Sequence, residues 1–256
     1  MKTDIKKIKT LIDAYRKATK DFIDYQKYNY YALTHHSTAL EGNTLTEKQV
    51  VNLLEYGKTF NLPFDELLMV SDHFKALSFV VLQAEKKRSI SPELIKEINA
   101  KVMQNTGGII RTTLGEYDSS KGDFRLSMVR AGVRTFPDFK KVPDLVKNFC
   151  KQTNEGIKNA KNLEQKCKVA FKAHFDLVSI HPFADGNGRT SRLIMNYIQA
   201  YFGLPLSLVL KKDKIAYIDS LEEARKKDDV DIFCDFMFGQ YASFLKKEIA
   251  ELKTKK

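Results

Sequence analysis

One stretch of the sequence, residues 181–192 (HPFADGNGRTSR), holds side chains that could bind a phosphate and move a proton. The apolar pattern before this stretch predicts a helix that ends just ahead of it, and Pro182 cannot continue that helix. Gly186 and Gly188 permit tight backbone turns that other residues resist. A new helix is expected to begin around Asn187, so its free N–H groups would point back into the turn and form an anion site.

Four ionisable side chains converge on this turn. His181 has an ordinary pKa of about 6.5, so it can accept a proton near neutral pH. Asp185 offers the hard oxygen ligand that Mg²⁺ uses when it bridges phosphates. Arg189 and Arg192 are three residues apart and share one helical face. Because the sequence contains no GxxxxGK(S/T) motif, these residues predict a phosphate site outside the Walker class.

The stretch matches without departure the signature HPFx(D/E)GNGRxxR, and through it the chain resembles the Fic-domain protein adenylyltransferases over roughly residues 60–240. The resemblance implies transfer of AMP from ATP to a Ser, Thr or Tyr hydroxyl of a target protein. It implies that His181 is the catalytic base and that Asp185 holds Mg²⁺ on the phosphates, with the Asn187 side chain among the groups that bind them. The full set of residues implied to bind ATP and its phosphates is Asp185, Gly186, Asn187, Gly188, Arg189, Thr190, Ser191 and Arg192.

A second motif, Ser37-Thr-Ala-Leu-Glu41-Gly42, lies far upstream. Alone it is weak, because Ser and Glu four residues apart are common and Gly42 suits an ordinary helix end. Beside the signature it resembles the family's inhibitory motif (S/T)xxxE(G/N), in the arrangement where the inhibitory helix precedes the core. The resemblance implies that Glu41 pairs with Arg192, in a geometry that can be bidentate, and so opposes productive ATP binding. It also implies that the same glutamate can assist removal of AMP.

Two further regions rest on the resemblance. Tyr217 falls where related enzymes have a tyrosine on the adenine side, and Arg225 replaces a small polar residue of some relatives. The segment that follows Gly122-Asp-Phe-Arg125 is similar to the family's target-docking flap, to which an extended target peptide could add as a strand. The flap residues are Met128, Val129, Arg130, Ala131, Gly132, Val133 and Arg134.

The elements that must position these residues are predicted to be helices, which gives an all-α fold. The resemblance implies that this fold is the Fic-type helical bundle with a short β-hairpin flap. A helix that starts near Ile5 is expected to open the chain, and the aromatic stretch 22–31 could continue it. Residues 105–142 break the helical pattern, and 125–134 are expected to form the hairpin. We expect an N-terminal arm (1–60) with the inhibitory motif and a catalytic core (61–256). The remaining helices are predicted at 46–57, 64–87, 92–104, 143–159, 163–179, 187–202, 213–225 and 230–252.

The composition predicts a folded protein of a reducing compartment. The wide spacing and apolar neighbours of Cys150, Cys167 and Cys234 predict buried thiols. The first ten residues lack the apolar run of a signal peptide, so a cytoplasmic location without a membrane partner is expected. The expected partners are ATP and target proteins, and a homodimer stays open.

The net charge of +11, from 43 Lys and Arg against 32 Asp and Glu, raises the alternative of a nucleic-acid-binding protein. The dispersion of the basic residues argues against it. Transfer of phosphate or phosphocholine instead of AMP also stays open, as does a catalytically silent interaction module. A metal hydrolase built on His174 and His181 lacks a third ligand at matching spacing.

Overall fold

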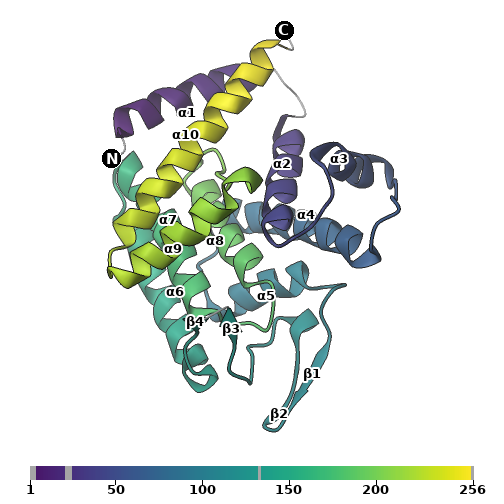
Figure 1. The fold of residues 1–256 in the computed structure, drawn as a ribbon. Helices are drawn as coiled ribbons and strands as arrows, with labels where there is room; N and C mark the ends of the chain where they lie inside the picture. The colour runs from purple at the N-terminus through teal and green to yellow at the C-terminus, as the bar shows by residue number, and fades with distance from the viewer. Residues whose placement is uncertain (1–3, 21–24, 132–133, 255–256) are drawn as a thin grey trace.

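The structure, a computed structural model, describes residues 4–20, 25–131 and 134–254. These residues contain ten α-helices and four short β-strands (Figure 1). This content confirms the predicted all-α class with a small β component. Single 3₁₀ turns lie at 119–121, 139–141 and 211–213. In chain order the elements are α1 (Ile5–Thr19), α2 (Tyr25–Leu40), α3 (Glu47–Tyr56), α4 (Phe64–Glu85), α5 (Pro92–Val102), β1 (Ile109–Thr112), β2 (Gly115–Asp118), β3 (Arg130–Ala131), β4 (Arg134–Thr135), α6 (Val142–Asn159), α7 (Leu163–Ile180), α8 (Asn187–Tyr201), α9 (Lys214–Lys226) and α10 (Val230–Thr254).

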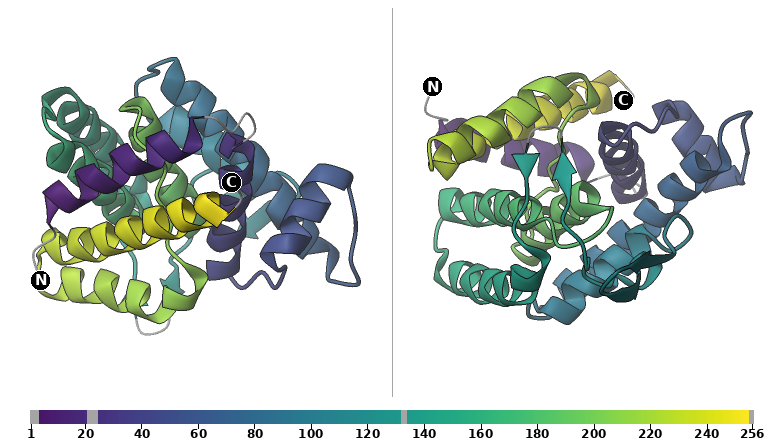
Figure 2. Two further views of the ribbon diagram at one scale, coloured as in Figure 1. Left: turned by 90° about the horizontal axis from the view of Figure 1, so that it is seen from above. Right: turned by 60° about the horizontal axis from the view of Figure 1, so that its bottom comes forward.

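Helix α8 lies at the centre of the bundle. Its side chains are buried on every face, which is the property of a helix surrounded by others. It packs against α7, α4, α5 and α2, so the start of α8 is held by elements from three parts of the sequence (Figures 1 and 2). The signature stretch therefore lies at the junction between two central helices rather than on an outer loop.

Local capping signals set several helix ends where the sequence predicts them. The Thr46 side chain accepts a hydrogen bond from the Gln49 N–H while the Gln49 side chain returns to Thr46, so α3 opens with a complete capping box. Gly57, with φ of 62°, closes the same helix in the left-handed conformation that glycine adopts without strain. Ser91 caps α5 and Pro92 occupies its first turn, as expected.

The N-terminal region differs from the prediction in one respect. α1 ends at Thr19 and a separate helix, α2, begins at Tyr25, while residues 22–24 of the aromatic stretch lie outside the described residues. The two helices have different partners, since α1 packs along α10 and α2 packs on α4 (Figure 2). Ile8 of α1 and Leu33 of α2 belong to the same hydrophobic cluster as the bundle. The division of the chain at residue 60 stays a prediction.

The irregular stretch 105–142 contains two strand pairs where the sequence predicts one. The hairpin of β1 and β2 is the additional pair, and it projects at the lower edge in Figure 1 with Ile109 opposite Asp118. Its exposed, short strands lack the alternating apolar pattern that would identify it in the sequence. The hairpin predicted over 125–134 is observed as β3 and β4 alone, with Arg130 opposite Thr135. Its pairing therefore begins five residues later than predicted and ends one residue later.

The three cysteines and the most apolar long helix are both packed into the protein. Cys150, Cys167 and Cys234 are buried free thiols, as predicted, and burial raises the pKa of each to about 12. Among the described helices, α4 alone is long and apolar enough to suit a membrane span by length and composition. Half of that apolar window is buried within the protein, where α4 packs against α2, α5 and α8.

Candidate active site

His181 closes α7 in an unusual backbone conformation. Its φ of 54° and ψ of 59° lie in the left-handed region, and its N–H donates to the Leu177 carbonyl at 3.0 Å. A residue with a β-carbon adopts this conformation at a cost of about 1–2 kcal/mol. Such strain is a recurrent feature of functional sites, because the surrounding structure must hold it in place.

The Asn187 side chain holds the turn between α7 and α8 in shape. Its Oδ1 accepts from the Phe183 N–H at 2.9 Å, and its Nδ2 donates to the Phe183 carbonyl at 2.9 Å. Phe183 is itself buried against Phe124, with ring centroids 5.6 Å apart. Each of the two polar groups of Asn187 thus forms one hydrogen bond within the turn, and the expectation that this side chain also binds phosphate stays a prediction.

Two glycines of the turn are required by close neighbours. Gly186 has φ of 76°, and a β-carbon there would lie 2.8 Å from Nδ2 of Asn99 on α5. The same Nδ2 donates to the Asp185 carbonyl at 3.2 Å and to the Thr190 hydroxyl at 3.1 Å, so α5 braces the start of α8. At Gly188 a β-carbon would lie 2.3 Å from Oε1 of Glu41. A carboxylate thus already lies against the positive N-terminal end of α8.

Arg189 is a buried cation with hydrogen-bonding capacity left over. Its side chain is 2% exposed, and its Nη2 lies 3.1 Å from Oδ2 of Asp185 and 3.4 Å from the sulfur of Met103. Within the described residues its Nε and Nη1 have no partner. A buried guanidinium is stable when its donors are satisfied, so these two donors beside a helix N-terminus point to an anionic ligand.

Arg192 has the opposite environment, because α2 supplies its partners. Its Nε donates to the Ser37 hydroxyl at 2.9 Å, and its Nη2 donates to the Ser37 carbonyl at 2.8 Å and to Oε1 of Glu41 at 2.6 Å. The Glu41 contact uses one carboxylate oxygen, so the pair is not bidentate. Burial acts to raise the pKa of Glu41, but the charge and hydrogen bond of Arg192, with help from Arg189, lower it overall. Glu41 is therefore a carboxylate at neutral pH.

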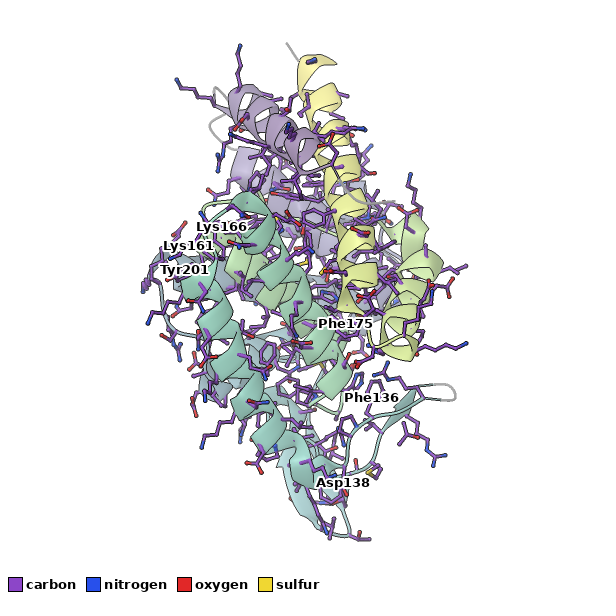
Figure 3. All side chains as sticks on the ribbon, turned by 90° about the vertical axis from the view of Figure 1, so that its left-hand side faces the viewer. Phe136, Asp138, Lys161, Lys166, Phe175 and Tyr201 are labelled. Carbon is purple, nitrogen blue, oxygen red and sulfur yellow. The ribbon has the colours of Figure 1, made fainter. Side chains whose placement is uncertain are left out.

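The His181 ring lies under an aromatic cover. Phe136 lies in the segment after β4 (Figure 3). Its ring stacks on that of His181, with centroids 3.8 Å apart and an interplanar angle of 19°. The Arg134 guanidinium in turn lies 4.7 Å from the Phe136 ring. Burial lowers the pKa of His181 to about 4, the Val178 carbonyl opposes this shift, and the charges of Arg125 and Arg134 add to it. The imidazole is therefore neutral at physiological pH and free to accept a proton.

Arg125 joins the flap to the signature turn, a role that the sequence does not predict. It is 1% exposed and donates three hydrogen bonds to main-chain carbonyls. The acceptors are His181 at 2.8 Å, Ser127 at 2.8 Å and Pro137 at 2.6 Å. The only sequence signal is its place in the Gly-Asp-Phe-Arg segment, because backbone acceptors carry no side-chain pattern.

The described flap residues are arranged as follows. Met128 is 51% exposed, and the Val129 carbonyl accepts from the Phe136 N–H at 3.3 Å. Arg134 forms an ion pair of 3.1 Å with Glu222, which links the flap to α9. Arg130 and Ala131 form β3. Gly132 and Val133, which the sequence also assigns to the flap, lie outside the described residues.

Tyr217 is turned into the core of the protein. It is 6% exposed, and its hydroxyl lies 2.8 Å from Nε2 of the buried His174. Because α9 packs on α10 and turns Tyr217 inward, the side chain packs against Phe233 and lies near Arg192. The contact with adenine that the resemblance implied stays a prediction. Arg225 is also engaged, donating to the Ser179 hydroxyl and pairing with Glu222.

The remaining predicted residues support the start of α8 and the end of α2. Thr190 and Ser191 are fully buried, and the Ser191 hydroxyl donates to the Gly188 carbonyl at 3.0 Å. Their side chains hold the helix rather than face a ligand. Gly42, with φ of 103°, follows α2, and its N–H donates to the Ala39 carbonyl.

The side chains of the site suit a magnesium ion only together with phosphate. The described residues contain no group of three His, Cys, Asp or Glu side chains that could hold a metal by themselves. The Asp185 side chain is 68% exposed and pairs with Arg189, two of whose donors have no partner among the described residues. One carboxylate fits Mg²⁺ when phosphate oxygens and water complete its shell, which is the usual arrangement for this ion. His174, hydrogen-bonded inside the core, is unsuited to the alternative of a metal hydrolase.

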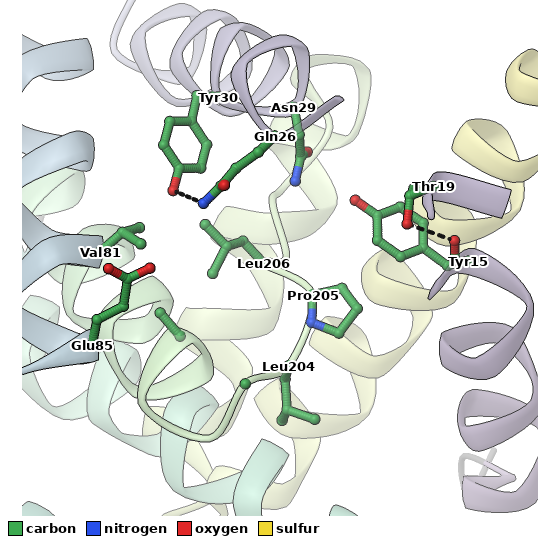
Figure 4. A pocket seen from close by; sticks show the side chains of 12 residues that line it. Tyr15, Thr19, Gln26, Asn29, Tyr30, Val81, Glu85, Leu204, Pro205 and Leu206 are labelled. Atoms are coloured by element: carbon green, nitrogen blue, oxygen red, sulfur yellow. Dashed lines mark hydrogen bonds between the residues drawn. The ribbon is translucent and has the colours of Figure 1, made fainter. Parts of the chain in front are cut away.

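A separate cavity lies away from this site, between α1, α2, the end of α4 and the loop after α8 (Figure 4). It has a volume of about 420 Å³, and Gln26, Tyr30 and Glu85 are among its polar lining residues. Among the described residues that line it, none belongs to the signature stretch. The chemistry inferred for residues 181–192 therefore does not depend on this cavity.

Comparison with known proteins finds one family and its relatives. Residues 89–199 match the Fic/DOC family. The chain is 32% identical over 211 residues to the protein adenylyltransferase Fic of Aedes aegypti, covering 79% of this chain and 38% of that protein. It thus spans about two fifths of the length of the curated relatives it matches.

Solved structures share the fold. A Fic-domain-containing signaling protein from Bacteroides thetaiotaomicron superposes with a TM-score of 0.79 at 20% identity, covering 97% of each chain. Fic-1 from C. elegans superposes with a TM-score of 0.78 at 24% identity, covering 98% of this chain and 73% of that one. At these identities the likeness shows the fold.

Proposed function

We propose that this chain, whose residues 89–199 match the Fic/DOC family, is a protein adenylyltransferase that transfers AMP from ATP to a hydroxyl group of another protein. The observation that carries the proposal is a neutral buried histidine, His181, next to a helix N-terminus and a buried Arg189 with two unused donors. The name of the curated relatives supports the same reaction class. It does not favour transfer of phosphate or phosphocholine, or a nucleic-acid-binding role.

In the proposed reaction, the imidazole of His181 accepts the proton of the attacking hydroxyl. The hydroxyl oxygen forms a bond to the α-phosphorus, and the bond from that phosphorus to the bridging oxygen of the β-phosphate breaks. AMP remains on the target, and pyrophosphate leaves with the electron pair of the broken bond. Catalysis rests on positioning and on charge stabilisation, because the protein forms no covalent intermediate.

The phosphates would be held by main-chain N–H groups at the start of α8 and by the free donors of Arg189. Mg²⁺ bound on the phosphates would supply further neutralisation of their charge, and Asp185 is the side chain placed to hold it. The Phe136 ring excludes water from one side of His181, which keeps the imidazole neutral. The ordering of the flap by Arg125 would present its strand edge to a target peptide.

Glu41 would hold this site in a low-activity state. Its carboxylate pairs with Arg192 and lies where the N-terminal end of α8 faces Gly188. A triphosphate that approached Arg192 would meet this negative charge, which repels it and misplaces its α-phosphate. Removal of the carboxylate would free Arg192 for the outer phosphates.

The reaction class can be tested with the Glu41→Gly variant, ATP labelled in turn at the α- and γ-phosphate, and a mixture of candidate target proteins. We expect protein-bound label from the α-position alone, and His181→Ala in the same background as a folded control that labels little. Label from the γ-position would show phosphate transfer, and no label from either position would contradict the proposal.

A further inference from the structure

A buried histidine on α4 adds a third helix to the inhibitory contact. His73 is 2% exposed, and its Nε2 lies 2.8 Å from the Ser37 hydroxyl of α2. Its Nδ1 is buried and has no partner among the described residues, so the bond to Ser37 is the one hydrogen bond of the ring there. The hydrogen-bonded link from the ring to the site therefore passes through Ser37.

The direction of the hydrogen bonds follows from the chemistry of Arg192. A guanidinium has donors and no acceptor, so its Nε–H donates to the Ser37 oxygen at 2.9 Å. The Ser37 hydroxyl proton is then free to be donated to the His73 ring nitrogen at 2.8 Å. Burial, together with the charges of Arg192 and Arg189, lowers the pKa of His73 well below its usual value, so the ring is neutral. In the tautomer with its proton on Nδ1, the Nε2 lone pair accepts the Ser37 proton. A chain of hydrogen bonds with one direction is stronger than its separate members.

The position of His73 is set independently of its ring. Asp72, the residue before it, is fully buried and accepts hydrogen bonds from the N–H and side-chain amide of Asn105 at 2.8 Å and 2.6 Å. α4 also packs along α8, the helix that carries Arg192. The His73 ring thus extends from a fixed helix to the hydroxyl that Arg192 uses.

We propose that His73 is a positioning residue for inhibition, which fixes the Ser37 hydroxyl and, through it, the register of α2 that brings Glu41 to Arg192 and to the start of α8. This inference rests on the proposed function and deepens it. Ser37 and Glu41 are four residues apart, so both face the same side of α2. An error in the placement of Ser37 would move Glu41 by a similar amount. The α4 helix therefore holds the inhibitory segment in place without itself contacting the nucleotide site.

The test is the rate of labelling from ATP labelled at the α-phosphate, in wild type and in the Glu41→Gly background. His73→Leu fills the space but offers no acceptor, and we expect it to raise labelling roughly three- to tenfold in the wild type, the worth of one hydrogen bond. His73→Gln, which can place an acceptor oxygen near the Nε2 position, should stay within about twofold of wild type. Ser37→Ala should raise labelling at least as much as His73→Leu, because it also removes the acceptor of the Arg192 Nε–H, and the double variant should not exceed Ser37→Ala.

The Glu41→Gly background separates positioning from a merely structural role. There, His73→Leu should give no further rise, because the carboxylate that His73 positions is gone. Thr34→Val is a matched control, since Thr34 is a fully buried residue of α2 whose hydroxyl has no partner among the described residues. It should leave labelling unchanged.

Two results would overturn the proposal. Either His73→Leu labels like wild type while Glu41→Gly is active, or His73→Leu lowers labelling equally in both backgrounds. If Glu41→Gly itself transfers no label, the proposed function fails first, and the two failures are thereby distinguished. If His73→Leu does not fold, His73→Phe, which also offers no acceptor to the Ser37 hydroxyl, carries the same test.

Discussion

The two arginines of the first turns of α8 lie one turn apart and have opposite surroundings. Arg192 donates to three oxygens of Ser37 and Glu41, which are more than 150 residues away in sequence. Arg189 has its one acidic partner, Asp185, on the adjacent turn, and its Nε and Nη1 have no partner within the described residues. A distant helix thus supplies acceptors for Arg192, whereas two donors of Arg189 are left without an acceptor among the described residues. This difference suggests that the site is complete but partly occupied by the protein itself.

The largest effect is expected from the loss of the His181 imidazole. His181→Ala should remain folded and lose AMP transfer by about two to four powers of ten, because a general base contributes that much. The measurement is single-turnover labelling in the Glu41→Gly background, with circular dichroism as the check on folding. Labelling at the parent rate would remove His181 from the mechanism.

The next effect compares the arginines directly. In the Glu41→Gly background, Arg189→Ala should reduce labelling by about two to three powers of ten, the usual cost of losing one preorganised donor to a developing charge. Arg192→Ala in the wild type removes the inhibitory contact as well as a phosphate partner, so it should not reproduce the activation expected from Glu41→Gly. An Arg192→Ala variant as active as Glu41→Gly would show that Arg192 serves inhibition alone.

A smaller effect is expected from Asp185. Although its own side chain is largely exposed, Asp185 pairs with the buried Arg189, so Asp185→Ala should lower the unfolding free energy by about 1–3 kcal/mol, the cost of leaving a buried donor unsatisfied. The same variant should require a much higher Mg²⁺ concentration for half-maximal labelling, and Asp185→Asn should behave alike because an amide is a poorer ligand. A Mg²⁺ titration identical to that of the parent enzyme would exclude Asp185 as a ligand.

The smallest effect concerns pH. The pKa of His181 is lowered to about 4, so its imidazole stays neutral as the pH falls from 8 to 6. Labelling at saturating Mg²⁺ and ATP should therefore change less than about twofold over that range, with no loss centred at the ordinary histidine pKa of about 6.5. A clear midpoint near pH 6.5 would show that the Phe136 cover does not exist in solution.

The same shift has a consequence for stability, with a sign that can be worked out. A histidine whose folded pKa is lowered binds protons in the unfolded state first, so its stabilising contribution is present above pH 6.5 and is lost as the pH falls toward 4. Burial lowers the pKa of His73, His174 and His181 in this way. The melting temperature should therefore fall steadily below pH 6.5, which a thermal scan can follow.

The sequence is informative where the determining interactions are local. The capping box at Thr46, the stop at Gly57 and the start at Ser91 depend on residues within four positions, and the sequence predicts all three. The signature turn is likewise placed by Pro182 and by the helix start at Asn187. Local capping energies act the same way in any fold, which is why they can be read without a structure.

The sequence is uninformative where a contact joins distant segments through the main chain or through burial. The three carbonyls that accept from Arg125 have no side-chain signature. The inward turn of Tyr217 depends on how α9 packs, and the stack of Phe136 on His181 depends on the path of the flap. The partnership of His73 with Ser37 joins α4 to α2 across 36 residues. Each of these requires the tertiary structure.

Inhibition by Glu41 is tested most directly by comparing the labelling rates of wild type, Glu41→Gln and Glu41→Gly, each with ATP labelled at the α-phosphate. Removing the carboxylate frees Arg192 and the start of α8, and each 1.4 kcal/mol of bias released corresponds to roughly tenfold in the competent population. We expect Glu41→Gly to label at least about tenfold faster than wild type. Glu41→Gln should lie between them, because it keeps the shape of the side chain and loses the charge. Equal labelling by wild type and Glu41→Gly would contradict inhibition by Glu41 and leave the contact between Glu41 and Arg192 as an ordinary helix-to-helix ion pair.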